Sequence, residues 1–190
     1  MSLRYGIIIV VFLCVLIAGG LFLRARYSTP QDRVQDPSEF QQYSNATYGL
    51  SFLYPDRYVF SEMDIPGGAM REHHVITLMR KEDLPLPTDG EGPPTITINI
   101  YQNNLDNQTT EGWIRNTNES NFKLSEGKFS STTISTLDAL SYRWSGLYEG
   151  TTIVHAQSNW VYTFTVTYLE MGAPIVQDFV AIRDSVRIVE

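Results

Sequence analysis

Cysteine is almost absent from this chain of 190 residues. The one cysteine, Cys14, lies within an apolar run, so the rest of the chain has neither a disulfide nor a cysteine metal site. A lipoprotein signal would place a small residue directly before the modified cysteine. Leu13 occupies that position, which argues against lipidation and leaves Cys14 as a small apolar side chain.

Positive charge is scarce after residue 26. Three of the 14 basic residues lie at or before Arg26, and all 21 acidic residues follow it. The soluble part therefore carries a formal charge of −10 with histidine neutral. This part lacks the basic face that would neutralise phosphates, so nucleic acid is excluded as a partner and adsorption to anionic lipid is disfavoured. Acidity of this size is typical of a solubility feature.

Familiar enzyme motifs are lacking as well. Neither a Gly-x-Ser-x-Gly turn nor the His-Glu-x-x-His of zinc proteases occurs, and 89–92 has glycines but no phosphate-binding lysine. A Ser/His/Asp site could assemble in space, for example from Ser141 and His155, but no spacing selects it. The sequence predicts no catalytic and no cofactor-binding residues, and a protein that is not an enzyme.

Two groups of residues could hold a metal ion. Glu72, His73 and His74 are consecutive, and His155 lies elsewhere, but adjacent side chains on a strand point to opposite faces. Asp83, Asp89 and Glu91 lie in a Gly/Pro-rich loop without the spacing of a calcium loop; these two groups are predicted to be ordinary strand and loop residues. We therefore predict no metal site.

One long apolar run is present, at 5–23, where nineteen residues carry no charge. At ~1.5 Å per residue a helix of this length spans roughly 28 Å, close to the thickness of a bilayer's hydrocarbon core. The small residues at 18–20 would suit signal cleavage, but the apolar run continues to Leu23, which favours an uncleaved anchor. We predict an anchor with flanks at 1–26, a polar linker at 27–43 and a soluble domain at 44–190.

The orientation of this anchor is ambiguous from charge alone. Arg4 precedes the run, whereas Arg24, Arg26 and Arg33 follow it. Because the side richer in Lys and Arg tends to stay in the cytoplasm, this count favours a cytoplasmic domain.

Alternating apolar and polar residues predict an antiparallel sheet. The clearest case is 160–169, where Trp160, Tyr162, Phe164 and Val166 share one face. Further strands are expected at 48–54, 57–61, 73–80, 95–101, 129–136, 139–148, 151–157 and 185–189. Apolar residues on both faces of 73–80 suggest that this strand is covered on both sides, and we place turns at 137–138, 149–150 and 158–159.

Two helices are expected among these strands. Thr109 or Thr110 can cap a short helix over 109–121, and Pro174 suits the first turn of a second helix. In the second helix Ile175, Phe179 and Ile182 recur on one face. The predicted fold class is α+β, a central antiparallel sheet flanked by helices and preceded by one transmembrane helix.

Two stretches together resemble PsbP-like domains. The first, 43–58, has an aromatic-Gly-aliphatic pattern at Tyr48-Gly49-Leu50, then a strand, Tyr54-Pro55 and an aromatic residue at Tyr58. The second, 178–188, resembles the family's last helix and strand. The resemblance covers 43–189 and implies an αβα sandwich. Its motifs are structural, so no ligand residue is carried over.

The resemblance also bears on function and place. Proteins of this family are extrinsic proteins on the lumenal side of photosynthetic membranes, and relatives of the fold bind protein partners. Bacterial chains with one N-terminal anchor and this domain are generally taken to face outward. The expected function is therefore an extracytoplasmic, membrane-anchored, non-enzymatic binding or assembly domain with a protein partner. We do not carry over a photosynthetic role.

Two alternatives have specific discriminators. A pilin-like subunit shares the layout of an apolar helix followed by a sheet, but it would have a basic leader and an acidic residue early in the helix, which 5–23 lacks. An enzyme on the same scaffold would have a pocket with convergent polar groups. Tyr142, Trp144 and Tyr148 could form a binding surface, although core packing is the expected role of these aromatic residues.

Overall fold

The computed structural model describes residues 39–67 and 71–189. The predicted membrane span 5–23 and most of the predicted linker 27–43 lie outside these ranges. Within them, no helix combines the length and the apolar character needed to cross a bilayer.

The strands are β1 (Phe40–Asn45), β2 (Leu50–Pro55), β3 (Tyr58–Ile65), β4 (His73–Arg80), β5 (Ile96–Gln102), β6 (Ser130–Ile134), β7 (Leu137–Ser145), β8 (Glu149–Ala156), β9 (Trp160–Tyr168) and β10 (Arg187–Ile188). The α-helices are α2 (Thr110–Asn116) and α3 (Pro174–Ser185), and single 3₁₀ turns lie at η2 (Lys81–Asp83) and η3 (Phe122–Leu124).

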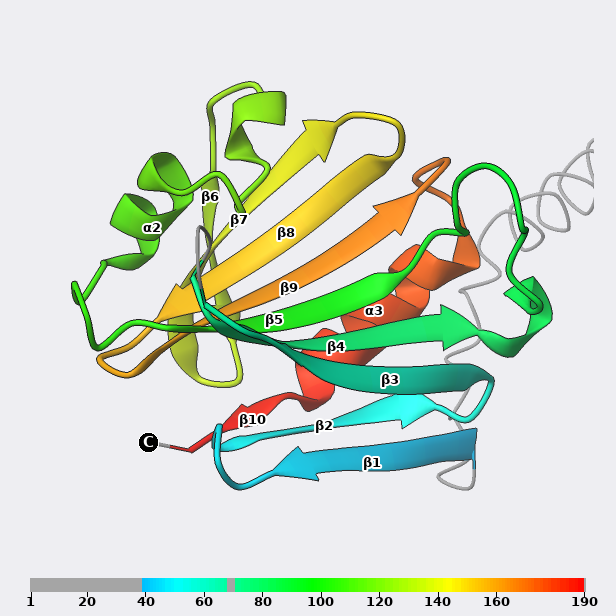
Figure 1. The fold of residues 1–190 in the computed structure, drawn as a ribbon, viewed down its shortest axis with the longest axis horizontal. Helices are drawn as coiled ribbons and strands as arrows, with labels where there is room; N and C mark the ends of the chain where they lie inside the picture. The colour runs from blue at the N-terminus through cyan, green and yellow to red at the C-terminus, as the bar shows by residue number, and fades with distance from the viewer. Residues whose placement is uncertain (1–38, 68–70, 190) are drawn as a thin grey trace, which may run out of the picture. The chain divides into compact units, whose positions relative to one another are not determined.

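The strands form two antiparallel sheets (Figure 1). The larger has seven strands in the order β3-β4-β5-β9-β8-β7-β6, and the smaller has three in the order β1-β2-β10. The coarse prediction, an antiparallel sheet with helices on it, is confirmed. Both predicted helices exist, with Thr109 as the N-cap of α2 and Pro174 in the first turn of α3.

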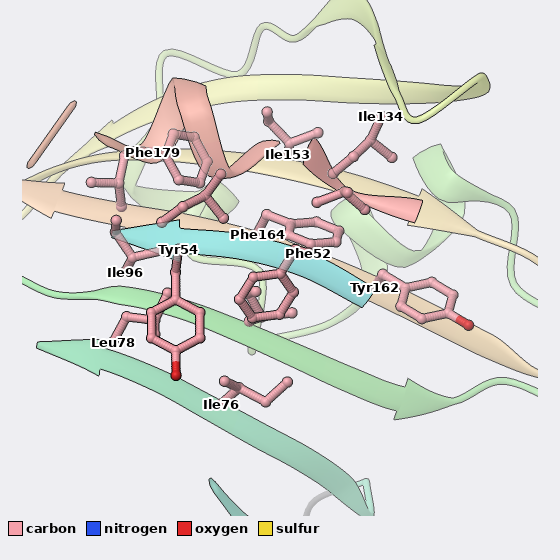
Figure 2. Packing of buried hydrophobic residues seen from close by; sticks show 14 of the residues in the cluster. Phe52, Tyr54, Ile76, Leu78, Ile96, Ile134, Ile153, Tyr162, Phe164 and Phe179 are labelled. Carbon is pink, nitrogen blue, oxygen red and sulfur yellow. The ribbon is translucent and has the colours of Figure 1, made fainter. Parts of the chain in front are cut away.

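The main core lies between the large sheet and a layer made of the small sheet and α3. Alternate residues of β9, among them Tyr162, Phe164 and Val166, face this core, as the sequence pattern predicts. Phe52 and Tyr54 of β2 and Phe179 of α3 pack against them (Figure 2). Burying these aromatic and aliphatic side chains stabilises the fold by ~25 cal/mol per Å² of apolar surface removed from water.

A second core covers part of the opposite face of the large sheet. Its buried residues come from α2 and from β5, β7, β8 and β9: Tyr101, Trp113, Ile114, Tyr142, Trp144, Val154 and Val161. Tyr142 and Trp144 therefore have the predicted packing role, while half-buried Tyr148 donates its hydroxyl hydrogen bond to the carbonyl oxygen of Gly92. Gly150 lies opposite Trp144 in the ladder, where a Cβ atom would come within 2.2 Å of the indole.

Several sequence expectations are wrong in detail. Residues 40–43, expected in the linker, begin β1; their Gln-rich, polar character reflects an edge strand with only Tyr43 buried among its six residues. The turn expected at 137–138 lies at 135–136, because Ser135 adopts the left-handed conformation (φ 56°). Gly150 belongs to β8 rather than to a turn.

Two further expectations fail for reasons of packing. The helix expected over 109–121 ends at Asn116, because the Ser120 hydroxyl bonds the carbonyl oxygen of Ile114 and competes with the helical ladder. β4 is fully buried on one face only: Ile76 and Leu78 lie in the main core, whereas Val75 and Met79 on the other face are half-buried.

A buried carboxylate joins the beginning of β3 to α3. Asp178 of α3 is 4% exposed. Its Oδ2 accepts a hydrogen bond of 2.7 Å from the Tyr58 hydroxyl, and both its oxygens are bonded by the Arg57 guanidinium. Burial and the Asp178 carboxylate raise the pKa of Tyr58, which therefore stays protonated and donates. These contacts fix α3 against the beginning of β3.

β10 and Val189 are held by the β1–β2 hairpin. β10 pairs with β2, and the Val189 amide donates to the carbonyl oxygen of Gly49 at 2.8 Å. Gly49 has φ +60°, and a Cβ atom there would lie 2.3 Å from the Val189 carbonyl oxygen. Only glycine combines this backbone conformation with so close an approach. The result is a fixed corner beside which the candidate site lies.

Candidate functional site

A groove of about 630 Å³ in the described part of the chain has a mixed polar and aromatic lining. It lies between the β1–β2 turn at 46–49, the β8–β9 turn at 157–159 and the end of β10, and we call it the hairpin groove. Its lining combines hydroxyl groups, side-chain amides and aromatic rings, which come from Asn45, Thr47 and Tyr48 around the first turn and from Ser158, Asn159 and Trp160 around the second. All the lining side chains are uncharged at neutral pH.

A chain of hydrogen bonds connects the two turns across the groove. The Gln157 amide nitrogen donates to the Tyr162 hydroxyl at 3.1 Å, and that hydroxyl donates to the Tyr48 carbonyl oxygen at 2.7 Å. The Tyr162 ring packs beside the main core while its hydroxyl points out of the cluster (Figure 2). Burial raises the pKa of Tyr162 to about 12, so its hydroxyl remains a donor at neutral pH.

One acceptor in this network has no partner among the described residues. The Gln157 side-chain oxygen is buried and unpaired, although its amide nitrogen is used. An unpaired buried polar atom costs about 1–3 kcal/mol. The atom is closed off from solvent, so a bound group reaches it only after the Gln157 side chain moves.

Aromatic rings form a wall of the groove. The ring centroids of Tyr48 and Trp160 are 5.1 Å apart in an edge-to-face arrangement. Tyr48 also lies 4.7 Å from the His74 imidazole. Burial raises the pKa of Tyr48, and Asp64 adds to this, so Tyr48 is a donor as well. Tyr48 thus belongs both to the groove and to a neighbouring cluster of charged groups.

This neighbour, the His74 cluster, consists of His74, Glu62, Asp64, Tyr43 and Tyr48. His74 is 7% exposed, with Nδ1 at 2.7 Å from an Asp64 oxygen and Nε2 at 3.3 Å from a Glu62 oxygen. The imidazolium form donates to both carboxylates at once. The Tyr43 hydroxyl donates to Glu62 at 3.0 Å and the Tyr48 hydroxyl donates to Asp64 at 3.4 Å. The cluster therefore ties the β1–β2 hairpin to β3 and β4.

The His74 cluster predicts an acid-dependent change. The hydrogen bond from His74 lowers the pKa of Asp64 below its usual range. The contact between Asp64 and His74 contributes its full stabilisation at pH values above about 3.9, the pKa of aspartate in the unfolded chain. This stabilisation is lost as the pH falls through the lower pKa that Asp64 has in the folded state. In a carbon-detected NMR titration, His74→Gln is expected to move the Asp64 pKa up toward 3.9. His73→Gln, on the opposite face, should leave it unchanged; equal shifts in both variants would contradict the assignment.

The candidate metal residues do not converge. His73 and His74 lie on opposite faces of β4, and the His73 ring stacks on Tyr101 at 4.5 Å. In the part of the chain that the structure describes, no group of three or more His, Cys, Asp or Glu residues could hold an ion. Asp83 is paired with Arg80, and Asp89 and Glu91 are exposed in the loop.

Ser141 and His155 do not form a catalytic pair. Ser141 lies opposite Ile153 in the β7–β8 ladder. The Nδ1 atom of His155 donates a hydrogen bond to the Asp138 carbonyl oxygen at 2.8 Å. Its Nε2 atom is buried and has no hydrogen-bond partner among the described residues. The imidazole stacks on Tyr162 at 6.3 Å and has a packing role.

Sequence patterns alone did not reveal the hairpin groove. Its two walls are turns that lie more than a hundred residues apart, and the hydrogen bond from the Tyr162 hydroxyl to the Tyr48 carbonyl links them. The pairing of β2 with β10 brings Val189 into the lining. The available signals were Tyr48-Gly49, a turn that requires glycine, and Ser158-Asn159, a turn directly before an aromatic residue.

Comparisons with known proteins give a fold but no sequence relative. No family model matches the chain, and no curated protein matches it. Among solved structures, cyanobacterial PsbP (CyanoP) from Synechocystis sp. PCC 6803 is similar with a TM-score of 0.52 at 12% identity, covering 82% of this chain and 96% of that one. A structure from Bacteroides thetaiotaomicron has a TM-score of 0.45 at 11% identity, covering 80% of this chain and 49% of that one. The first likeness shows that the chain has the PsbP-like fold, as the motifs at 43–58 and 178–188 predict.

Proposed function

We propose that this chain is a single-pass, membrane-anchored domain that faces outward and works by binding a protein partner rather than by catalysis. Residues 5–23 would hold it in the membrane and 27–39 would hold the domain away from the surface. Support comes from the uncharged apolar run and from the PsbP-like fold. Because a fold hosts many functions, the binding role rests on the chemistry of the groove itself.

The observation that carries the proposal is the chemistry of the hairpin groove. Its lining offers hydroxyl and side-chain amide groups beside two aromatic rings, those of Tyr48 and Trp160. An uncharged, extended peptide segment matches this lining, because its N–H groups can donate to such acceptors while an apolar side chain packs on Tyr48 and Trp160.

The same lining favours binding over acid–base chemistry. Tyr48 and Tyr162 are the titratable side chains that line the groove, and burial raises the pKa of both. Each therefore stays protonated at neutral pH and serves as a hydrogen-bond donor rather than as a general base. The carboxylates of the neighbouring His74 cluster bond to His74 and to tyrosine hydroxyls.

Site-specific photocrosslinking in native membranes tests this proposal. A benzoylphenylalanine placed at Ser158, an exposed residue of the groove, should give one discrete crosslinked product. The same group at Thr133, exposed on β6, is the matched control. The proposal is wrong if both positions give the same products or if Ser158 gives none.

The aromatic wall should determine how much product forms. Trp160→Ala removes one of the two rings, and losing an aromatic anchor of an interface typically costs about 2 kcal/mol, roughly thirtyfold in affinity. The yield of the Ser158 crosslink should fall accordingly, and tryptophan fluorescence at Trp113 and Trp144 should show that the fold is retained. An unchanged yield would exclude Trp160 from the interface.

A further inference from the structure

The outer strand of the seven-stranded sheet, β3, has an unusual surface. It spans eight residues at one end of the strand order, and the ladder with β4 is its one strand pairing in the described ranges (Figure 1). Residues 59–64 are all exposed, including Val59 at 41%, Phe60 at 41% and Met63 at 57%. The strand carries neither proline nor lysine, two of the features that usually protect sheet edges from pairing, and its charged side chains are the acids Glu62 and Asp64.

The hydrogen-bonding groups of this edge can be assigned residue by residue. The Lys81 amide donates to the Arg57 carbonyl oxygen at 2.8 Å, directly beyond the Tyr58–Arg80 pair of the ladder. Because hydrogen-bonded and non-hydrogen-bonded pairs alternate in antiparallel ladders, Ser61 directs its amide and carbonyl toward β4. Phe60 and Glu62 direct theirs outward, where a further strand would pair.

The exposed apolar side chains continue those of β4. Val59 lies opposite Met79, and Met63 lies opposite Val75. These four residues form two short apolar rows on the face that neither α3 nor the small sheet covers. Both rows stop at the edge of β3.

We propose that two copies of this chain associate by pairing β3 with β3, antiparallel, about a twofold axis at Ser61. This register places Val59 opposite the partner's Met63, so that each apolar row continues across four strands. Phe60 lies opposite the partner's Glu62, and these two residues exchange outward amide and carbonyl hydrogen bonds. The surface is self-complementary, as a twofold dimer requires. This inference is independent of the hairpin groove.

Charge and geometry select this register over its neighbours. An axis at Glu62 would place two Glu62 carboxylates directly opposite one another, which destabilises a pair of strands. An axis at Phe60 would pair 58–62 alone and leave Met63 beyond the paired region. With the axis at Ser61, Glu62 and Asp64 face Phe60 and Tyr58 of the partner copy, and both carboxylates keep their contacts with His74.

A disulfide across the axis tests the register. In a non-hydrogen-bonded pair the Cα atoms are about 4.5 Å apart, within disulfide reach. In the full-length chain in membranes, with Cys14→Ser as background, Ser61→Cys should form a covalent dimer under mild oxidation. Ser131→Cys on exposed β6 is the control, and a dimer yield at least about tenfold lower is expected there. Equal yields would overturn the proposal.

Two further variants test the pairing itself. Met63→Cys should not crosslink to itself but should crosslink to Val59→Cys when the two are co-expressed; efficient Met63 self-crosslinking would overturn the register.

Phe60→Pro removes an outward N–H without removing a bond to β4, whereas Phe60→Ala keeps that N–H. Crosslinking through Ser61→Cys should be lost in the first and kept in the second, with tryptophan fluorescence reporting on folding. Equal crosslinking in these two variants would exclude edge pairing.

Discussion

Replacing Asp178 with alanine is expected to destabilise the domain by about 3 kcal/mol. The change leaves the buried Tyr58 hydroxyl without an acceptor and the Arg57 guanidinium without its partner. The value lies at the low end for a broken buried pair because the Arg57 side chain is 50% exposed and regains water. Urea unfolding of the full-length chain in detergent, followed by tryptophan fluorescence, measures the loss.

Asp184 provides a matched control on the same helix. It also pairs with an arginine, Arg183, but its side chain is 60% exposed. Asp184→Ala should therefore change the free energy of unfolding by less than about 1 kcal/mol. A double-mutant cycle between Asp178→Ala and Tyr58→Phe should show a coupling energy of about 1–2 kcal/mol. Similar losses for Asp178→Ala and Asp184→Ala would mean that Asp178 does not hold α3 in place.

Replacing Gly49 with alanine should cost a comparable amount, again about 3 kcal/mol. Roughly 1 kcal/mol comes from placing a Cβ atom at φ +60°, and about 2 kcal/mol comes from displacing the Val189 carbonyl that lies 2.3 Å from it. The hydrogen bond from Val189 to Gly49 should weaken too. Hydrogen exchange of the Val189 amide reports this locally, and urea unfolding gives the total.

Gly127 separates the two contributions to the Gly49 effect. It also has a positive φ, +73°, but a Cβ atom there would meet nothing within 4 Å. Gly127→Ala should therefore cost about 1 kcal/mol, the conformational part alone. If the two alanine variants lose the same stability, the close approach of Val189 has no energetic importance.

The contacts of Asp178 and Gly49 explain why the resemblance to PsbP-like domains rests on two distant stretches. Gly49 in the first stretch receives the Val189 amide that follows the second, and Tyr58 in the first bonds Asp178 in the second. The Ser185 hydroxyl adds another link, accepting the Leu53 amide at 2.8 Å. The motifs are therefore contacts that close the fold, which is why they indicated the architecture and no ligand site.

Local patterns in the sequence predicted the sheet well where burial alternates. β9 has one face in each core, so its period of two was visible in the residue types themselves. β1 was missed because one of its six residues is buried, and a polar edge strand looks like a linker. β4 was misjudged in part because Val75 and Met79 look like core residues, although they lie on a face that is only half-buried.

The candidate sites were harder to predict than the fold. The opposite orientations of His73 and His74 followed from strand geometry alone. The contacts of His74 with Glu62 and Asp64 depend on the register of β3 and β4, which a single sequence does not specify. The hairpin groove depends on long-range contacts, the hydrogen bond from Tyr162 to Tyr48 and the pairing between β2 and β10, which no local periodicity encodes.

The central claim, a domain anchored by 5–23 and facing outward, is tested most directly by labelling in intact cells. Thr133→Cys, in a Cys14→Ser background, places one thiol on exposed β6. A membrane-impermeant maleimide should label it as fully in intact cells as after lysis, on a membrane-bound chain that retains residues 1–26. Labelling only after lysis would contradict the outward orientation, and a labelled chain that lacks 1–26 would contradict the anchor.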